Sequence, residues 1–483
     1  MELGFTTAAY VVAAVLFILS LGGLSGQESA KRAVWYGIFG MALAVFATLI
    51  GPGSGLWALS VLLIAAGGVI GYFLAARVEM TQMPELVAGM HALVGLAAVF
   101  VGFNADLEIK NVASAVNSEA VKELTGFAAL VAKKSAVEIN ILRVELFLGV
   151  FIGAITFTGS IIAYGKLSGR VTSAAVKLPG GHFLNASAAI ISVLCLIWYL
   201  QTGGFLPLLL MTILAFFIGF HLIMGIGGAD MPVVVSMLNS YSGWAAAAIG
   251  FSLGNDLLIV VGALVGSSGA ILSYIMCKAM NRSLSNVLFG GFGAATSSSE
   301  GGGQIQGEVK PITAEDAYLI LEAANSVLVV PGYGMAVAQA QHVVRELGEL
   351  LEDNGCEVKY AIHPVAGRMP GHMNVLLAEA NVSYDVLKDL DEINPEFEDC
   401  DVALILGAND VVNPAARHDQ SSPIYGMPIL NVDKSRTVII NKRSMNPGFA
   451  GVQNELFGYD NSIMVFGDAK DMLNDLLKEV KEL

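Results

Sequence analysis

The chain has 483 residues, of which 55% are hydrophobic and 14% are charged, and its formal net charge is −15 at pH 7. This apolar share is typical of a membrane protein, and the negative charge argues against nucleic acid as a partner. The four cysteines (Cys195, Cys277, Cys356 and Cys400) are too scattered for a disulfide framework or a metal site, so we expect no metal.

Hydrophobic runs of about 20 residues, the length that crosses a bilayer, follow one another through the first part of the chain. We predict nine membrane-spanning helices, over residues 4–24, 34–53, 55–76, 84–103, 142–165, 184–202, 205–226, 230–252 and 256–278. The boundaries between 34 and 76 are the least certain, because that region is nearly continuous. Residues 1–3 carry no basic charge, so we expect the first run to be a span and not a cleaved signal peptide.

Basic residues alternate along the loops between these runs. The loops after the first, third, fifth and ninth runs carry Lys31, Arg32, Arg77, Lys166, Arg170, Lys177, Lys278 and Arg282, and the loops after the second, sixth and eighth carry none. Because basic loops stay in the cytoplasm, we expect the N-terminus outside and the C-terminal part in the cytoplasm. Residues 104–141 have balanced charges and constrain the orientation weakly; whether they contain a further helix stays open.

The composition changes after the ninth run. Residues 283–310 are rich in Gly and Ser and are predicted to form a flexible linker. Beyond them we predict strands at 326–331, 358–362, 402–407, 428–432, 436–441 and 462–466, and helices at 314–324, 334–353, 383–390 and 468–481. This alternation favours a mostly parallel, doubly wound sheet. We therefore expect a membrane domain at 1–282, a linker at 283–310 and a soluble α/β domain at 311–483.

A glycine turn joins the first predicted strand of the α/β domain to the helix that follows it. The turn is Gly332-Tyr333-Gly334, and the residues that continue it are Met335, Ala336 and Val337. Strand, glycine turn and helix in this order indicate a dinucleotide site, because glycine lets the backbone approach a pyrophosphate and a helix N-terminus offers N–H groups to it. The predicted fold class is thus a polytopic α-helical membrane domain followed by a Rossmann-like domain.

The residues at the ends of two strands favour NADP(H) over NAD(H). An NAD site usually has a carboxylate at the end of its second strand, but here the strand ends in His363-Pro364. Lys442, Arg443 and Ser444 follow another strand and offer two cations and a hydroxyl, which suits a 2′-phosphate. Taken alone, the cluster is better explained as a solvated basic strand end. Taken with the missing carboxylate and the glycine turn, it favours NADP(H).

Several longer blocks stand in order along the chain. They are Met83–His91, Gly228–Pro232, Ser236–Trp244, Gly266–Ala270, Gly332–Val337, His363–Gly371, Gly407–Asp410 and Lys442–Met445. Through these blocks the chain resembles the beta subunit of proton-translocating NAD(P)+ transhydrogenase over essentially its whole length. It departs from the family at Phe449, where a tyrosine is often found in the loop that covers the nucleotide, so a ring stack is kept and a hydroxyl contact is lost.

The resemblance implies that hydride passes from NADH to NADP+ while protons move inward across a bacterial inner membrane. It implies that this chain binds NADP(H), and that NAD(H) is bound by a partner alpha subunit in a dimer of alpha–beta units. Direct transfer between two nicotinamides needs positioning and exclusion of water, and no protein nucleophile. Coupling would then act through NADP(H) affinity, with an open state that exchanges nucleotide and an occluded state that aligns the rings.

The resemblance also assigns roles to four polar residues. His91 and Asn239, both within predicted spans, would lie on the proton path, Asp230 at its cytoplasmic entrance, and Asp410 would couple the nucleotide to the proton. Ionisable groups inside spans are costly, which favours a function for His91. Structural explanations remain for each: a buried hydrogen bond for His91, an interhelical contact for Asn239, a helix cap for Asp230 and a turn for Asp410.

We expect the remaining site residues to contact the nucleotide. Besides the glycine turn and the Lys442 cluster they are Val365, Ala366, Gly367, Arg368, Met369, Pro370, Gly407, Ala408, Asn409, Asp410, Gly426, Met427, Met445, Gly448, Phe449, Asp468 and Ala469. Residues 448–451 are expected to form a mobile cover. His221 and the small face made by Gly262, Gly266, Ser267, Ser268 and Gly269 are explained by packing, although the family places that face along the proton path.

Two other functions are compatible with a membrane bundle that carries a nucleotide domain. The chain could be a transporter or channel whose α/β domain senses NADP(H), or a structural anchor for another dehydrogenase. The first is weakened because the spans show no pair of broken helices of the kind that forms a midplane substrate site. The second leaves the polar residues in the spans without a role.

Overall fold

The computed structural model describes residues 2–51, 56–115, 126–173, 175–176, 180–289, 307–422, 424–448 and 450–481. Its contacts divide the chain into two compact units. Unit 1 comprises Met1–Gly225 and Val234–Ile271, and unit 2 comprises Ile226–Val233 and Leu272–Leu483. The domain boundaries at 282 and 310 stay a prediction, because most of the predicted linker, residues 290–306, lies outside the described residues.

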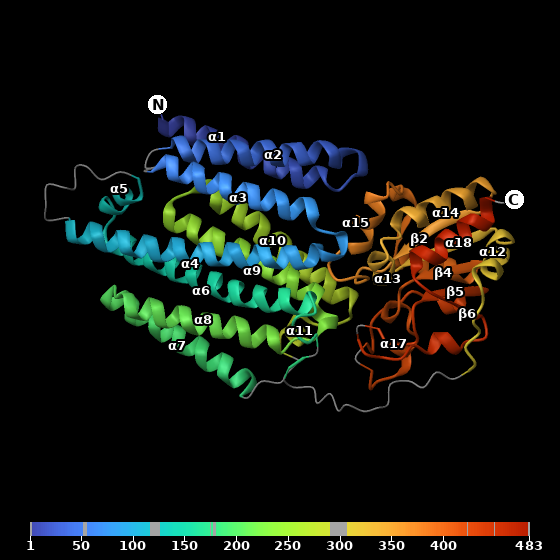
Figure 1. Cartoon of the computed structure of the whole chain (residues 1–483). Helices are drawn as coiled ribbons and strands as arrows, with labels where there is room; N and C mark the ends of the chain where they lie inside the picture. Colours follow the sequence, from blue (N-terminus) through green and yellow to red (C-terminus); the bar gives the residue numbers. More distant parts are fainter. Residues whose placement is uncertain are drawn as a thin grey trace. The chain divides into compact units, whose positions relative to one another are not determined.

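Long helices account for most of the described residues before position 290 (Figure 1). They are α1 (Glu2–Gly23), α2 (Gln27–Ile50), α3 (Trp57–Arg77), α4 (Met83–Ala115), α6 (Ala136–Leu167), α7 (Gly181–Thr202), α8 (Phe205–Met224), α9 (Met231–Leu253) and α10 (Asp256–Ala279). Within the described residues, eight of them are long and apolar enough to cross a membrane, and α9 falls outside that set. A helix thus stands at each of the nine predicted runs, and the multi-pass bundle is confirmed.

Residues 104–141 contain more helix than the predicted spans allowed. The helix α4 continues to Ala115, α5 covers Gly126–Ala132, and α6 already begins at Ala136. A capping box starts α6: the Ser135 hydroxyl accepts from the Glu138 N–H, and the Glu138 carboxylate accepts from the Ser135 N–H. Residues 116–125 lie outside the described residues. The predicted spans stopped too early because hydrophobicity ends before the helix does.

Glycines bring two pairs of helices in unit 1 into close contact. A Cβ at Gly95 of α4 would lie 2.5 Å from the Gly153 oxygen of α6, and a Cβ at Gly243 of α9 would lie 2.3 Å from the Gly266 nitrogen of α10. The Ser240 hydroxyl also donates to the Gly266 oxygen, at 2.7 Å. This contact agrees with the packing explanation of the small face on α10, because only glycine lets helix backbones approach so closely.

The α/β part contains a six-stranded parallel sheet in the order β3-β2-β1-β4-β5-β6. The strands are β1 (Ser326–Pro331), β2 (Glu357–Ile362), β3 (Leu387–Asp389), β4 (Val402–Leu406), β5 (Thr437–Lys442) and β6 (Ser462–Phe466). Each neighbouring pair is parallel. This is the strand order of dinucleotide-binding folds. The first three strands are added towards one edge of the sheet and the last three towards the other, so the order reverses between β1 and β4. The predicted doubly wound fold is therefore confirmed.

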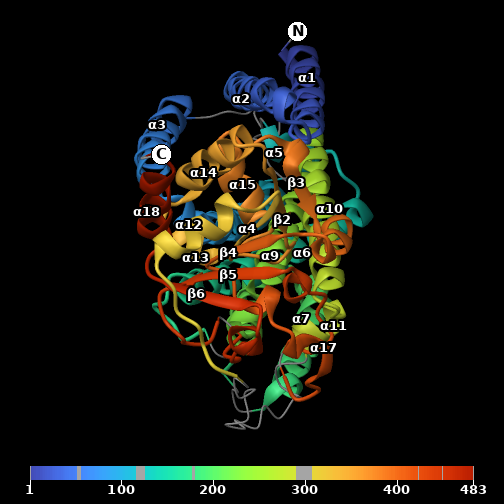
Figure 2. The same cartoon turned by 90° about the vertical axis from the view of Figure 1, so that its right-hand side faces the viewer.

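Apolar segments cover the sheet (Figures 1 and 2). Alternate residues of the strands, among them Leu328 and Ile405, pack with Phe397, Leu430 and Phe457 from short helices and connecting segments. The helix α18 (Ala469–Lys481) packs against both α12 (Ala314–Glu322) and α14 (Gln341–Asp353). The Tyr360 hydroxyl of β2 donates to a backbone oxygen of α14. Short helices α11 (Leu284–Phe289), α13 (Tyr333–Val337), α15 (His372–Glu379), α16 (Leu390–Ile393) and α17 (Ala415–His418) complete the set.

Three predicted elements of the α/β part are wrong. The helix at 334–353 is split into α13 and α14 by Gln339, whose φ of 50° is left-handed. Residues 387–389 of the predicted helix 383–390 form edge strand β3, because pairing with β2 overrides helix propensity. The apolar run 428–432 is not a strand: Leu430 donates to the Val411 oxygen and packs in the core beside the sheet.

Candidate functional site

The glycine turn after β1 crosses the loop after β4 where the sheet reverses its winding direction. A Cβ on Gly332 would lie 2.4 Å from the Ala408 Cα, and one on Gly407 would lie 2.3 Å from the Gly334 Cα. Gly407 also has a left-handed φ of 66°. The Gly332 N–H donates to the Leu406 oxygen and the Gly334 N–H to the Gly407 oxygen, at 2.9 and 3.0 Å. These glycines therefore allow two loops to cross, which the sequence motif alone did not indicate.

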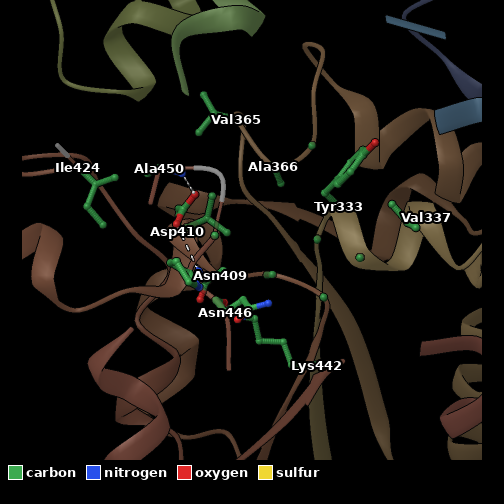
Figure 3. Close-up of a pocket in the computed structure, with 18 of the residues that line it drawn as sticks. Tyr333, Val337, Val365, Ala366, Asn409, Asp410, Ile424, Lys442, Asn446 and Ala450 are labelled. Atoms are coloured by element: carbon green, nitrogen blue, oxygen red, sulfur yellow. Dashed lines mark hydrogen bonds between the residues drawn. The ribbon is translucent and has the colours of Figure 1, made fainter. Parts of the chain in front are cut away.

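A cavity of about 460 Å³ opens in unit 2 beside this crossing. Its size lies within the ~300–1,000 Å³ range of ligand pockets. Figure 3 shows Asn409, Asp410, Lys442 and Tyr333 around it. The predicted contact residues that line it are Gly332, Tyr333, Gly334, Val337, Val365, Ala366, Gly367, Gly407, Ala408, Asn409, Asp410, Met427, Lys442, Arg443, Ser444, Gly448, Asp468 and Ala469.

Other predicted contact residues lie away from the cavity lining. They are Met335, Ala336, Arg368, Met369, Pro370, Gly426 and Met445, while Phe449 lies outside the described residues. Met335 and Ala336 are fully buried. Arg368 instead holds its guanidinium 4.3 Å from the centre of the Tyr333 ring, which ties the loop after β2 to the glycine turn.

Asp410 lies at the edge of the cavity and is held by its neighbours. The Ala450 N–H donates to its Oδ2 at 2.9 Å, and the Asn409 amide donates to its Oδ1 at 3.4 Å (Figure 3). A Cβ on Gly448 would come within 2.4 Å of Oδ1, so only glycine fits there without a shift. The carboxylate is thereby tied to Ala450 as well as to the loop after β4.

Lys442 ends β5, and it lies at the carboxyl edge of the sheet with Arg443 and Ser444 exposed beside it. Its ammonium donates to the Asn446 oxygen and lies 4.9 Å from the centre of the Phe457 ring. Partial burial lowers the pKa of Lys442, and the Asp410 carboxylate offsets part of this effect. The three residues fit a phosphate, since two cations and a hydroxyl meet at the carboxyl edge, where ligands of such sheets bind.

His363, at the end of β2, is a buried structural residue. Its Nε2–H donates to the Pro428 oxygen at 2.7 Å, and its Nδ1 accepts from the Val365 N–H at 3.2 Å. Burial lowers its pKa to about 4, although the bond to Pro428 raises it. The neutral ring therefore joins the loop after β2 to residues 424–428, both of which contribute to the cavity lining.

In unit 1, His91 of α4 meets Asn239 of α9. Its Nε2–H donates to the Asn239 Oδ1 at 3.0 Å, and its buried Nδ1 has no hydrogen-bond partner among the described residues. The residues lie 148 positions apart in the sequence, and the fold brings them together. His221, in contrast, is buried in α8 against the ring of Phe217, as expected of a structural residue.

Asp230 ends the short 3-10 turn Gly228–Asp230 that precedes α9, and it forms an ion pair that the sequence did not reveal. The Arg282 guanidinium donates to both of its carboxylate oxygens at 2.8 Å. Asp230 itself is almost completely buried. A helix cap was the alternative interpretation, but a buried carboxylate paired with arginine is a different and stronger contact.

Several residues that line the cavity were missed from the sequence. Most of them lie within two residues of a predicted contact, so extending each motif would have found them; these include Ile424, Tyr425, Asn441, Asn446, Pro447, Ala450 and Gly467. Met280 and Arg282 also line the cavity and lie far from any predicted contact in the sequence. Asn454 was also missed: it is fully buried and donates to the Asn409 oxygen at 3.0 Å. Nothing in its local sequence indicates that contact.

Comparisons with known proteins identify the family of this chain. The family model described as "NAD(P) transhydrogenase beta subunit" matches residues 6–479. Two proteins named "NAD(P) transhydrogenase subunit beta", both from Rhodospirillum rubrum and one from a particular strain, are each 54% identical over 474 residues, which is 98% of this chain and of each relative. The chain therefore belongs to the NAD(P) transhydrogenase beta subunit family.

Proposed function

We propose that this chain binds NADP(H) in the cavity beside β1, β4 and β5, and that it conducts the protons whose movement is coupled to hydride transfer. The observation that supports this most directly is the grouping of Lys442, Arg443 and Ser444 with the Gly332–Gly334 turn around one cavity. The end of β2 supports the choice of NADP(H), because His363 offers no carboxylate to a ribose hydroxyl.

The chemistry at the cavity needs little from the protein besides position. NADP(H), when bound, supplies the nicotinamide that takes or gives the hydride. Lys442, Arg443 and Ser444 would hold the 2′-phosphate, Tyr333 and Val337 would border the ligand, and residues 448–450 would exclude water. The N–H groups of Gly332 and Gly334 already bond to the β4 loop, and α13 has only five residues. The pyrophosphate would therefore depend less on this helix N-terminus than the motif alone implies.

The proton path would pass through His91 and Asn239. A relay histidine needs one ring nitrogen that exchanges a proton while the other is held. The Nε2 bond to Asn239, with an Nδ1 that has no hydrogen-bond partner in the described part of the chain, fits this requirement. Asp230 and Arg282 would form the cytoplasmic entrance, and Asp410 would couple nucleotide occupancy to proton occupancy.

The family also supports the arrangement of the whole enzyme. A beta subunit requires an alpha subunit, which would carry the NAD(H) site, and we propose a dimer of alpha–beta units. The protein is a multi-pass membrane protein; we propose the bacterial inner membrane, with the N-terminus outside and the nucleotide domain, residues 311–483, in the cytoplasm. Family membership leaves no need for the transporter and anchor functions considered from the sequence.

Binding selectivity tests this proposal. The full-length chain, purified in detergent, should bind NADPH and NADP+ in calorimetry at least about tenfold more tightly than NADH and NAD+, the size of one charge-assisted contact. When the chain and the alpha subunit are reconstituted in liposomes, hydride transfer should change the pH of the lumen. The sign of that change should reverse when the direction of hydride transfer is reversed. Equal affinity for both nucleotides, or a preference for NAD(H), would remove the proposed role of the Lys442 cluster.

A further inference from the structure

Asn454 lies behind the cavity and makes three hydrogen bonds. Its side chain is completely buried. Its amide donates to the Asn409 backbone oxygen at 3.0 Å and to the Asn409 Oδ1 at 3.3 Å, and its own Oδ1 accepts from the Leu456 N–H at 3.0 Å. Only an amide side chain offers both an NH₂ donor and a carbonyl acceptor, and the other amide residue, glutamine, is one methylene longer.

The bonds of Asn454 lead directly to Asp410. Asn409, which Asn454 holds at two atoms, donates from its own amide to the Asp410 Oδ1. The backbone of Asn409 has φ −139° and ψ −71°, outside the main α and β regions, so neighbouring contacts must keep it there. The other carboxylate oxygen of Asp410 accepts from Ala450. Asn454, Asn409 and Asp410 thus form a chain from a buried anchor to the cavity edge.

We propose that Asn454 is a positioning residue: it holds Asn409, and through Asn409 it fixes the Asp410 carboxylate at the nucleotide site. The inference rests on the proposed function, because its effect is measured as NADP(H) affinity. Asn454 itself does not line the cavity, so its effect on the nucleotide passes through Asn409 and the Asp410 carboxylate that Asn409 holds.

Asn413 provides a matched control. It too is completely buried; its amide donates to the Gln453 oxygen at 3.0 Å, and its Oδ1 accepts from the Ala415 N–H at 3.1 Å. It therefore joins the same two stretches of chain with the same chemistry. Its backbone N–H donates to the Asp410 backbone oxygen at 3.3 Å, a bond that a side-chain substitution keeps. Among the described residues its side chain bonds to neither Asn409 nor Asp410, and it does not line the cavity. A change at Asn413 should disturb the fold as much as one at Asn454 without releasing Asp410.

The experiment compares Asn454→Ser with Asn413→Ser in the full-length chain. Serine is a good substitute for the acceptor of each asparagine, as its use in helix caps shows, but it is too short to donate to the distant oxygen. Dissociation constants for NADPH are measured by calorimetry, and unfolding temperatures are measured alongside. Each change is also combined separately with Asp410→Asn, which gives two double variants. For every variant, KM and kcat are measured with the alpha subunit present.

We expect Asn454→Ser to raise the NADPH dissociation constant about tenfold, the effect of one lost buried hydrogen bond. The KM for NADPH should rise more than kcat falls, and the KM for the NAD(H) substrate should stay unchanged. Asn413→Ser should leave the NADPH dissociation constant, both KM values and kcat as in the original chain. In the Asp410→Asn background, Asn454→Ser should weaken binding no further, because its route to the nucleotide has already been removed.

Three results would overturn the inference: no change in affinity for Asn454→Ser, equal changes for Asn454→Ser and Asn413→Ser, or a full additional loss in the Asp410→Asn background. If Asn454→Ser does not fold, Asn454→Asp, which keeps the shape and the acceptor, takes its place with Asn413→Asp as control. Failure of the original chain to bind NADPH would instead refute the proposed function, so the two failures are distinguishable.

Discussion

Lys442 shows how the surroundings of one side chain bear on its role. Its ammonium is partly buried, lies over the Phe457 ring and donates to the Asn446 oxygen. It is thus held in place on the cavity lining, whereas Arg443 and Ser444 beside it are exposed. A cation that is already desolvated and oriented loses less entropy when a phosphate binds. The simple alternative, a freely solvated strand end, fits Arg443 better than Lys442.

Lys442→Met should therefore reduce NADPH affinity by about 10–100-fold, corresponding to loss of a charge-assisted bond, and leave NADH binding nearly unchanged. Calorimetry on the full-length chain measures both values. Lys434→Met is the control, since Lys434 precedes β5, at the other end of the strand, and pairs with Glu398 at 2.6 Å. Equal losses for NADPH and NADH would show that Lys442 supports the fold and does not read the 2′-phosphate.

His363 predicts a pH dependence of stability. Its pKa is about 4 when folded and about 6.5 when unfolded, so between these values the unfolded chain binds the extra proton. The contribution of His363 to the free energy of unfolding is complete above pH 6.5. As the pH falls towards 4, the free energy of unfolding decreases by at most about 3 kcal/mol. His363→Gln should lower the unfolding temperature at neutral pH and flatten its decline between pH 6.5 and 4.

The control for this prediction is His418→Gln, because His418 is exposed at 58% and pairs with Glu455 on the surface. Scanning calorimetry of the full-length chain across that pH range gives the slopes. If His363→Gln retains the slope of the original chain, the acid sensitivity of the domain originates elsewhere.

At the scale of elements, the helices of unit 1 differ in how they are held. The helices α4 and α6 pack through Gly95 and Gly153, where backbones approach closely. In α3, by contrast, no described residue is buried, and a Cβ on Gly67 would meet no atom within 4 Å. All three helices have nearly the same mean hydropathy, so only their neighbours distinguish them.

Gly95→Ala should destabilise unit 1 by about 1–3 kcal/mol, because its Cβ would lie 2.5 Å from the Gly153 oxygen and the two helices must separate. Gly67→Ala in α3 is the control and should be neutral or slightly stabilising, since alanine favours a helix. The unfolding temperature in detergent compares the two. A smaller loss for Gly95→Ala than for Gly67→Ala would contradict the packing assigned to α4 and α6.

Strong periodic patterns predicted elements well, and short apolar runs predicted them poorly. The membrane runs and the strands β1, β4 and β6 stand where the sequence placed them, because long apolar segments and β-branched runs have few alternative conformations. The strand predicted at 428–432 and the helix predicted at 383–390 were wrong, because tertiary contacts decide the conformation of both segments. Leu430 packs against the sheet without pairing, and Leu387 pairs at an edge.

At the scale of the whole molecule, the proposed coupling links His91 in unit 1 to the cavity in unit 2. If proton occupancy at His91 changes NADP(H) affinity, the nucleotide must change proton affinity by the same factor. His91→Asn should then remove proton-coupled turnover and most of the pH dependence of NADPH affinity, while NADPH still binds. Proton uptake in liposomes and calorimetry at several pH values measure these effects.

His221→Asn is the matched control for that prediction. His221 is another buried histidine of the membrane unit, and its ring stacks on Phe217 at 5.3 Å, so its replacement should spare the pH dependence. Proton-coupled turnover that is unchanged in His91→Asn would remove His91 from the pathway.

The sequence by itself determined the membrane runs, the α/β class and the site motifs Gly332–Gly334, Gly407–Asp410 and Lys442–Ser444. These follow from local properties, such as hydrophobicity over a span, strand and turn propensity, and residue chemistry at strand ends. Only the tertiary structure decided that the glycines serve a crossing of two loops, that Asp230 pairs with Arg282 and that Asn454 holds Asn409. Each of these contacts joins residues far apart in the chain, so its energy depends on packing that no local pattern records.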